Sequence, residues 1–166
     1  MHMFCGPIRY ETSSFQIQNT YRFQQLLIPR MTTMRCLDDS KTYTQYCSDL
    51  MNDQIRNYLI VKDVVKEFQN DGKIIILSER RQHLTILYEM LKHLHIHVYV
   101  LTGERKTKER NEIIAKVRNF NSKEKFILLA TSKLLGEGFD LPALSTLFLV
   151  MPISDESRIE QYTGRI

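Results

Sequence analysis

The fold of this chain is decided by the stretch Lys73-Ile74-Ile75-Ile76-Leu77-Ser78-Glu79-Arg80. Residues 74–77 form an uninterrupted apolar run that begins with three β-branched side chains, which favour strands. A run without polar alternation is typical of a strand covered on both faces, as in a parallel sheet. We therefore expect a buried strand that ends in a hydroxyl and two charged side chains.

The sequence on either side of this strand has the periodicity of helices. Upstream, apolar residues recur at steps of three and four and so share one helix face: Met51, Ile55, Tyr58, Val61, Val65 and Phe68. The stretch Asn70-Asp71-Gly72 should end that helix, because Gly and Asn tolerate the left-handed geometry of a C-cap. Downstream, a second helix face is predicted from Leu84, Leu87, Tyr88, Leu91 and Leu94.

Strand and helix patterns continue to alternate towards the carboxyl end. Further strands are predicted at residues 96–100, 126–130 and 147–151, and further helices over 113–120 and 155–162. Such alternation indicates βαβ units, which build a parallel sheet with helices on both faces. Ligands of open α/β sheets bind at the carboxyl ends of the strands, so the residues that follow each strand are the candidates for chemistry.

Composition excludes several classes of protein. The 166 residues suit one domain, and no apolar run approaches the length of a membrane span. Three scattered cysteines argue against a disulfide framework and a zinc knuckle, so we expect an intracellular protein in a reducing compartment, the cytoplasm or nucleus. The net charge of +4 is a weak indication of a polyanionic partner. Eight Lys or Arg against four Glu between residues 104 and 125 fit either such a partner or a solvated helix face.

Hydroxyl-bearing or glycine residues follow three predicted strands. They are Ser78, Thr102 with Gly103, and Thr131 with Ser132. Hydroxyls and free backbone N–H groups at a helix start can hold a phosphate, and three such positions along one sheet edge could follow successive phosphates of one strand. The alternative is helix capping, which also prefers Ser and Thr.

Two further stretches stand out near the carboxyl end. In Gly136-Glu137-Gly138-Phe139-Asp140-Leu141-Pro142 the glycines permit close backbone approach to a ligand, and the aspartate can bind a ribose hydroxyl. An ordinary Gly-rich turn is the alternative. In Gln161-Tyr162-Thr163-Gly164-Arg165 the arginine offers a donor fork suited to phosphate, or a plain surface charge.

Taken in order, these stretches resemble motifs IV, IVa, V and VI of superfamily 2 helicases, over about residues 55 to 166. The resemblance is nearest to helicases of large DNA viruses and to the XPB-like and restriction-translocase branches. The likeness to viral helicases adds a viral factory or virion to the expected intracellular locations. It implies an α/β, RecA-like three-layer domain with a parallel central sheet and helices on both faces. It also implies that residues 1–47 are a linker or extended arm from a missing first lobe, and that residues 48–166 form the C-terminal RecA-like domain.

The resemblance assigns roles by position. Contacts to the sugar-phosphate backbone are expected from Ser78, Arg80, Thr102, Gly103, Arg110, Thr131 and Ser132. Contacts to the nucleotide are expected from Gly138, Asp140, Gln161 and Arg165, with Arg165 as the catalytic arginine. Thr107 stands where the family has the Gln of a Gln-x-x-Arg element, so Arg110 represents only half of that element. The family's second arginine would follow three residues after Arg165, and we expect the chain to be truncated inside motif VI.

Other helicase elements have no counterpart in these 166 residues. No Gly-x-x-x-x-Gly-Lys-Ser/Thr sequence occurs, and no Asp-Glu box follows a strand. ATP and Mg²⁺ are therefore expected to be held mainly by the N-terminal lobe, and the chain alone should not hydrolyse ATP. No metal site of its own is expected, although His93, His95 and His97 alternate, because no cysteine or carboxylate completes a set.

Three hypotheses about function follow. The first is the C-terminal motor lobe of an ATP-dependent helicase or translocase, with nucleic acid (DNA favoured over RNA) and the N-terminal lobe as partners, and no membrane. The second is a degenerate RecA-like lobe that only binds nucleic acid or protein. The third is an unrelated doubly wound domain, which would bind a mononucleotide by itself.

Overall fold

The computed structural model describes residues 26–33, 40–70, 72–94, 96–103, 107–120, 124–131, 144–153 and 162. Contacts within the chain divide it into two units, Met1–Met31 and Thr32–Ile166. The fold described below is that of the second unit. None of the described helices is long and apolar enough to cross a membrane.

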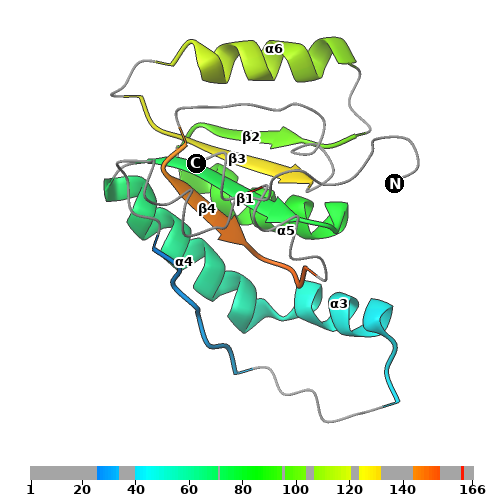
Figure 1. Ribbon diagram of the computed structural model, residues 1–166. Coiled ribbons are helices and arrows are strands. Elements are labelled where there is room, and N and C mark those ends of the chain that lie inside the picture. Colours follow the sequence, from blue (N-terminus) through cyan, green and yellow to red (C-terminus); the bar gives the residue numbers. More distant parts are fainter. Residues whose placement is uncertain are drawn as a thin grey trace, which may run out of the picture. The chain divides into compact units, whose positions relative to one another are not determined.

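The centre of this unit is a sheet of parallel strands. The strands are β1 (Lys73–Ser78), β2 (Val98–Leu101), β3 (Phe126–Thr131) and β4 (Thr146–Leu149), and their order is β2-β3-β1-β4 (Figure 1). All three pairings are parallel, which confirms the predicted sheet. The last strand ends two residues earlier than predicted, and Val150 still donates its backbone N–H to Leu77 O at 3.1 Å.

Side chains from alternate positions of the strands build a core on each face of the sheet. On one face, Ile74, Ile76, Ile127 and Leu129 pack with Val64, Leu84, Leu87 and Leu91. On the other, Ile75, Leu77, Leu128 and Ala130 pack with Val117 and Tyr162. Residues 74–78 and 126–130 are therefore buried throughout, as expected for central parallel strands.

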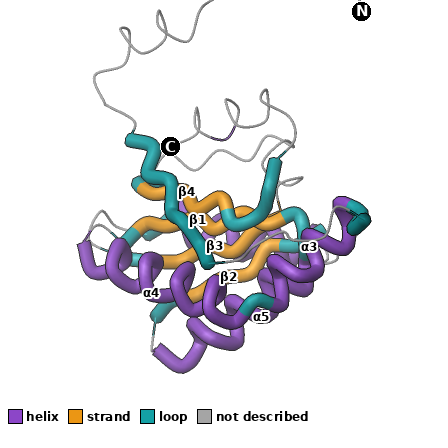
Figure 2. The backbone as a smooth tube through the Cα atoms, turned by 90° about the horizontal axis from the view of Figure 1, so that it is seen from below, coloured by secondary structure: helices purple, strands orange, loops and turns teal. Residues whose placement is uncertain are grey.

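Helices cover both faces, so the unit has three layers. Helices α4 (Gln54–Asn70) and α5 (Arg81–Leu91) lie on the first face, and α6 (Thr107–Arg118) lies on the other (Figure 1). The view from below shows α4 and α5 side by side across the strands (Figure 2). A short 3₁₀ turn, η1 (Lys92–Leu94), follows α5, and Leu94 in it is exposed rather than on the predicted buried face. The three-layer α/β architecture is confirmed.

The predicted helix face over residues 51–68 is wrong in its first half. Met51 belongs to a separate helix, α3 (Tyr43–Asn52), and Asp53 is the C-cap of that helix. The Asp53 carboxylate accepts the backbone N–H of Arg56 at 3.0 Å and so starts α4 in a new register. As a result Ile55 and Tyr58 are 70% and 66% exposed, and Asn57 is on the buried side in their place.

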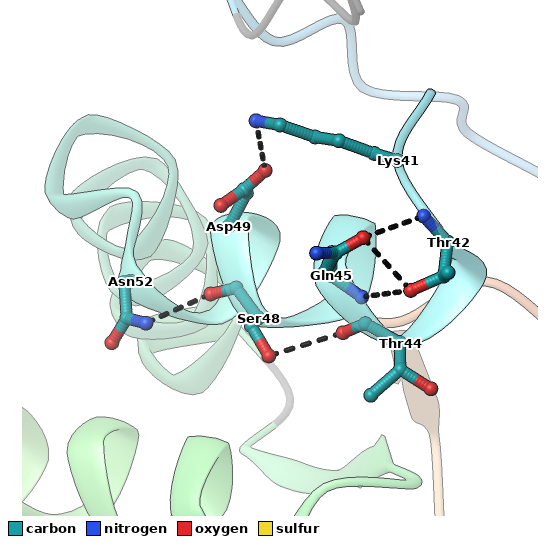
Figure 3. A network of polar contacts seen from close by, with 7 residues as sticks. All are labelled: Lys41, Thr42, Thr44, Gln45, Ser48, Asp49 and Asn52. Atoms are coloured by element: carbon teal, nitrogen blue, oxygen red, sulfur yellow. Dashed lines mark hydrogen bonds and ion pairs between the residues drawn. The ribbon is translucent and has the colours of Figure 1, made fainter. Parts of the chain in front are cut away.

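Helix α3 begins with a capping box. Thr42 Oγ1 accepts the backbone N–H of Gln45 at 3.4 Å, and Gln45 Oε1 accepts that of Thr42 at 2.7 Å (Figure 3). Cys47 and Met51 on its inner side pack against Met151 beyond β4. The helix is thereby attached next to the carboxyl edge of the sheet, where Tyr43 donates its hydroxyl to Pro152 O at 3.2 Å.

The predicted stop of α4 at Gly72 is confirmed. Gly72 has the left-handed φ of +74°, and its N–H bonds to Glu67 O at 3.3 Å, so it satisfies a carbonyl of the last helical turn. A Cβ at this position would overlap the side chain of Lys125. Glycine is therefore required here by both the backbone conformation and the close approach of a side chain.

Candidate nucleic-acid interface

The residues that follow the strands lie together at the carboxyl edge of the sheet. Ser78, the last residue of β1, pairs with Thr131, the last residue of β3. Leu101 of β2 pairs with Ala130 of β3, so Thr102 follows β2 beside the end of the same strand. The predicted gathering of three strand ends at one edge is therefore confirmed for Ser78, Thr102 and Thr131.

These residues differ in how far they reach solvent. Thr102 and Thr131 are half-buried, and Gly103 is exposed. A Cβ placed on Gly103 would meet no atom within 4 Å, so the space above this backbone is open to a ligand. Arg110 lies in the first half of α6 and is half-buried.

Ser78 is fully buried, and its hydroxyl is engaged within the protein. Its Oγ accepts the backbone N–H of Arg80 at 3.1 Å and lies 3.2 Å from Arg80 O. It also lies 3.3 Å from Nδ1 of His83. These contacts hold a tight turn between β1 and α5, so Ser78 shapes the turn that presents Glu79 and Arg80.

Arg80 occupies the N-cap position of α5, with φ −105° and ψ 114°. Its carbonyl oxygen accepts the backbone N–H groups of His83 at 3.1 Å and Leu84 at 3.3 Å. The side chain makes no capping hydrogen bond and is half-buried. The backbone of Arg80 is therefore held by hydrogen bonds at both its N–H and its carbonyl oxygen. Its side chain leaves the backbone at the sheet edge where Thr131 also lies.

The turn is backed by a buried pair of polar side chains. His83 Nε2 lies 2.9 Å from Asn57 Oδ1, and Asn57 Nδ2 donates to Met51 O at 2.7 Å. Both residues are 2% exposed or less. Burial, with a smaller contribution from the positive charge of Arg56, lowers the pKa of His83 from 6.5 to about 4, so the imidazole is neutral at pH 7.

Arg56 ties the junction of α3 and α4 to the edge strand. Its guanidinium donates to Leu50 O at 3.3 Å and, through a short hydrogen bond, to Val150 O. Burial lowers its pKa. The Arg56 guanidinium therefore joins a carbonyl near the end of α3 to one that directly follows β4.

Motifs V and VI fall mostly outside the described residues. This applies to the predicted site residues Ser132, Gly138, Asp140, Gln161 and Arg165. Within motif VI the structure describes Tyr162, which is helical, 3% exposed and packed in the core that contains Ile75 and Leu77. In the described ranges no group of three His, Cys, Asp or Glu could hold a metal ion.

Sequence reasoning missed Asn57, His83 and Arg56. The signal for His83 was its spacing of four and eight residues from Leu87 and Leu91, which places it on the buried face of α5. Asn57 and Arg56 carry no comparable signal, because their face depends on where α4 begins.

The family described as the helicase conserved C-terminal domain matches residues 54–166 of the chain. Transcript termination protein A18 of rabbit fibroma virus (strain Kasza) is 30% identical over 131 residues, 77% of this chain and 27% of that protein. The protein of the same name from myxoma virus (strain Lausanne) is 32% identical over 119 residues, 70% of this chain and 24% of that protein. The chain spans about a quarter of the length of these curated relatives, and they confirm the expected likeness to viral proteins.

Solved structures show the same fold. T4 UvsW superposes with a TM-score of 0.63 at 20% identity, over 76% of this chain and 25% of that one. The C-terminal part of the Fun30 ATPase domain superposes with a TM-score of 0.58 at 22% identity, over 69% of this chain and 38% of that one. Domain 2 of the DEAD-box helicase Mss116p, solved with an RNA duplex, superposes with a TM-score of 0.58 at 16% identity, over 66% of this chain and 44% of that one. The RecA-like fold expected from the motifs is thereby confirmed.

Proposed function

The chain belongs to the family of helicase conserved C-terminal domains, as a RecA-like lobe of superfamily 2, and on this premise we propose that it is the second motor lobe of an ATP-dependent helicase or translocase. The observation that carries the proposal is the shared carboxyl edge of β1, β2 and β3. There Thr131 pairs with Ser78 at the start of the turn that presents Arg80, and Thr102 follows the next strand along the same edge. Hydroxyls, backbone N–H groups and a guanidinium are the groups that bind phosphate oxygens.

The nucleic-acid track is proposed to run along this edge. Contacts from Arg80, Thr102, Gly103, Arg110 and Thr131, together with Ser132, go to phosphate and sugar, which carry no base identity. The open space above Gly103 supports close approach of a backbone. The contribution of Ser78 is proposed to be indirect, because its hydroxyl already has partners in the turn. DNA is proposed as the track, with RNA as the comparison.

The nucleotide side of the proposal concerns motifs V and VI. Gly138, Asp140, Gln161 and Arg165 are proposed to face ATP that, with Mg²⁺, is held mainly by an N-terminal lobe. Arg165 would place its guanidinium against the γ-phosphate and stabilise the charge that develops during phosphoryl transfer. Tyr162, the described residue of motif VI, is buried in the core of the lobe, which supports the assignment of this motif to the same domain.

The test is Arg165→Ala in a protein that joins this lobe to its N-terminal lobe. We expect nucleic-acid-stimulated ATP hydrolysis to fall by about 10³-fold, the scale of an arginine finger, while affinity for single-stranded DNA stays within about twofold. Arg118→Ala, in the last turn of α6, serves as the matched control. Unchanged turnover in Arg165→Ala would contradict the assignment. Nucleic-acid binding without any turnover in the parent protein would support a lobe that only binds.

A further inference from the structure

The buried polar side chains of the part of the chain that the structure describes form one connected row. They are Asn57, His83 and Ser78, each 2% exposed or less. The row runs from Met51 O through Asn57 and His83 to Ser78 and the backbone N–H of Arg80, over distances of 2.7, 2.9, 3.3 and 3.1 Å. It therefore connects the end of α3 to the turn that presents Arg80.

The direction of each hydrogen bond follows from the donors available. Asn57 donates its amide N–H to Met51 O, which leaves Oδ1 as an acceptor, so His83 Nε2 carries the proton. The neutral ring then has Nδ1 as an acceptor, and the single hydroxyl proton of Ser78 lies between two acceptors, His83 Nδ1 at 3.3 Å and Arg80 O at 3.2 Å, both of which belong to the turn or to its support. Ser78 Oγ in turn accepts from Arg80 N. Every member thus has a partner, and each side chain fixes the rotamer of the next.

Polar groups in a core are costly when they lack partners, and apolar side chains of similar size fill the same space without that requirement. The surrounding core is apolar: Leu84, Leu87 and Ile76 are fully buried nearby on the same face. Unlike apolar packing, hydrogen bonds fix the orientation of the groups that they join. The last group in this row is the backbone N–H of Arg80, so the row fixes the backbone that carries the Arg80 side chain.

We propose that Asn57 and His83 are positioning residues for nucleic-acid binding, which hold the Ser78–Arg80 turn so that Arg80 meets the phosphate backbone in a fixed geometry. The proposal rests on the proposed function of this edge. It differs from a purely structural role, in which the row contributes to stability and the affinity for nucleic acid does not depend on it.

A double-mutant cycle separates the two roles. The affinity of the chain for a fluorescein-labelled single-stranded DNA is measured by fluorescence anisotropy at low ionic strength. The variants are Arg80→Ala, the apolar pair Asn57→Leu with His83→Leu, and all three together. His83→Gln, which keeps a hydrogen-bonding side chain in the core, is a second variant that is measured in the same cycle. Circular dichroism checks that each variant is folded.

We expect Arg80→Ala to weaken binding by about fivefold, as for the loss of one phosphate contact. The apolar pair should weaken binding by about threefold when Arg80 is present and should have no effect when Arg80 has been replaced by alanine, because its effect passes through that side chain. His83→Gln should lose less than the apolar pair, with the same dependence on Arg80. Thr85→Ala, on the exposed side of α5, is the matched control and should bind as the parent chain does.

Two results would overturn the positioning role while leaving the proposed function intact. One is a folded apolar pair or His83→Gln that binds as tightly as the parent chain. The other is a loss of equal size whether or not the arginine side chain at position 80 is present. If Arg80→Ala itself binds normally, or the parent chain does not bind, the proposed role of this edge fails, and the positioning role fails with it.

Discussion

The ammonium group of Lys125 lies 3.0 Å from the carbonyl oxygen of Phe68 and 5.9 Å from the centre of that residue's ring. The same group also donates to the carbonyls of Gln69 and Asn70 at 2.5 and 3.4 Å. A cation at a helix C-terminus satisfies carbonyls that have no partner in the helix and interacts favourably with the helix dipole. Lys125, the residue before β3, thereby caps the carboxyl end of α4. Its side chain lies directly against Gly72, where the chain turns.

Gly72→Ala is expected to destabilise the fold. A left-handed φ costs an L-residue about 1–2 kcal/mol, and the added Cβ would overlap Lys125, so the free energy of unfolding should fall by at least that amount. Urea denaturation followed by circular dichroism measures it. Gly103→Ala is the matched control, because nothing lies within 4 Å of its Cβ, and its midpoint should be unchanged. Equal midpoints for both variants would contradict the account of Gly72.

Stability should depend on pH through His83. The pKa of this group is 6.5 in the unfolded chain and about 4 in the fold, so between these values the unfolded state binds one more proton. The contribution of His83 to the free energy of unfolding is therefore fully present above pH 6.5, and it is lost as the pH is lowered to about 4. Since one pKa unit corresponds to about 1.4 kcal/mol, the fall from 6.5 to about 4 corresponds to a loss of about 3 kcal/mol.

Urea denaturation at several pH values between about 4 and about 7 measures this dependence. His83→Gln should lose this contribution to the slope, whereas His97→Gln on the exposed surface should retain it. A slope that is the same in all three proteins would rule out His83 as its source.

Arg56→Met should loosen the junction between α3 and α4. The variant keeps an apolar stem but loses the hydrogen bonds to Leu50 O and Val150 O. Hydrogen bonds to a charged group contribute about 1.5–3 kcal/mol, and we expect a loss of that order in the free energy of unfolding. Lys62→Met, on the exposed side of α4, should change it by less than about 0.5 kcal/mol. Hydrogen exchange should show faster exchange in α3 in the Arg56 variant, and unchanged protection there would argue against the connection.

The salt dependence of DNA binding should distinguish charged from neutral contacts at the sheet edge. Each lost phosphate contact by a cation lowers the slope of log affinity against log salt concentration by about 0.7–0.9, which is expected for Arg80→Ala and for Arg110→Ala. Thr102→Val should weaken binding without a change in slope, because a hydroxyl releases no counterion. A slope that neither arginine variant alters would mean that the track lies elsewhere.

The sheet and its carboxyl edge could be predicted because their signals are local. The apolar runs before Ser78 and Thr131 each define a buried strand, and Gly72 marks a helix end by its own conformational freedom. Parallel pairing then brings the two strand ends together without further information. The class of fold and the placement of three candidate residues follow from these features alone.

The rest depended on facts that periodicity does not contain. Steps of three and four residues fit two neighbouring faces of a helix. Which face of α4 is buried depends on Asp53, because the helix is interrupted there and α4 begins in a new register. The contact between Asn57 and His83 joins residues 26 positions apart. Which polar residue enters a core is decided by the partner it meets there, and a single sequence does not show that partner.

The order of the strands has a consequence for how the chain folds as it is synthesised. Among the described strands, β1 pairs with β3 and β4, and β2 pairs with β3 alone. Neither β1 nor β2 therefore gains a hydrogen-bonded neighbour in this sheet until Phe126–Thr131 has left the ribosome. At synthesis rates of about 5–20 residues per second, the apolar strand 73–78 remains for several seconds with only its flanking helices to cover it. Assembly of the sheet should then be a late and cooperative event, set by the emergence of β3.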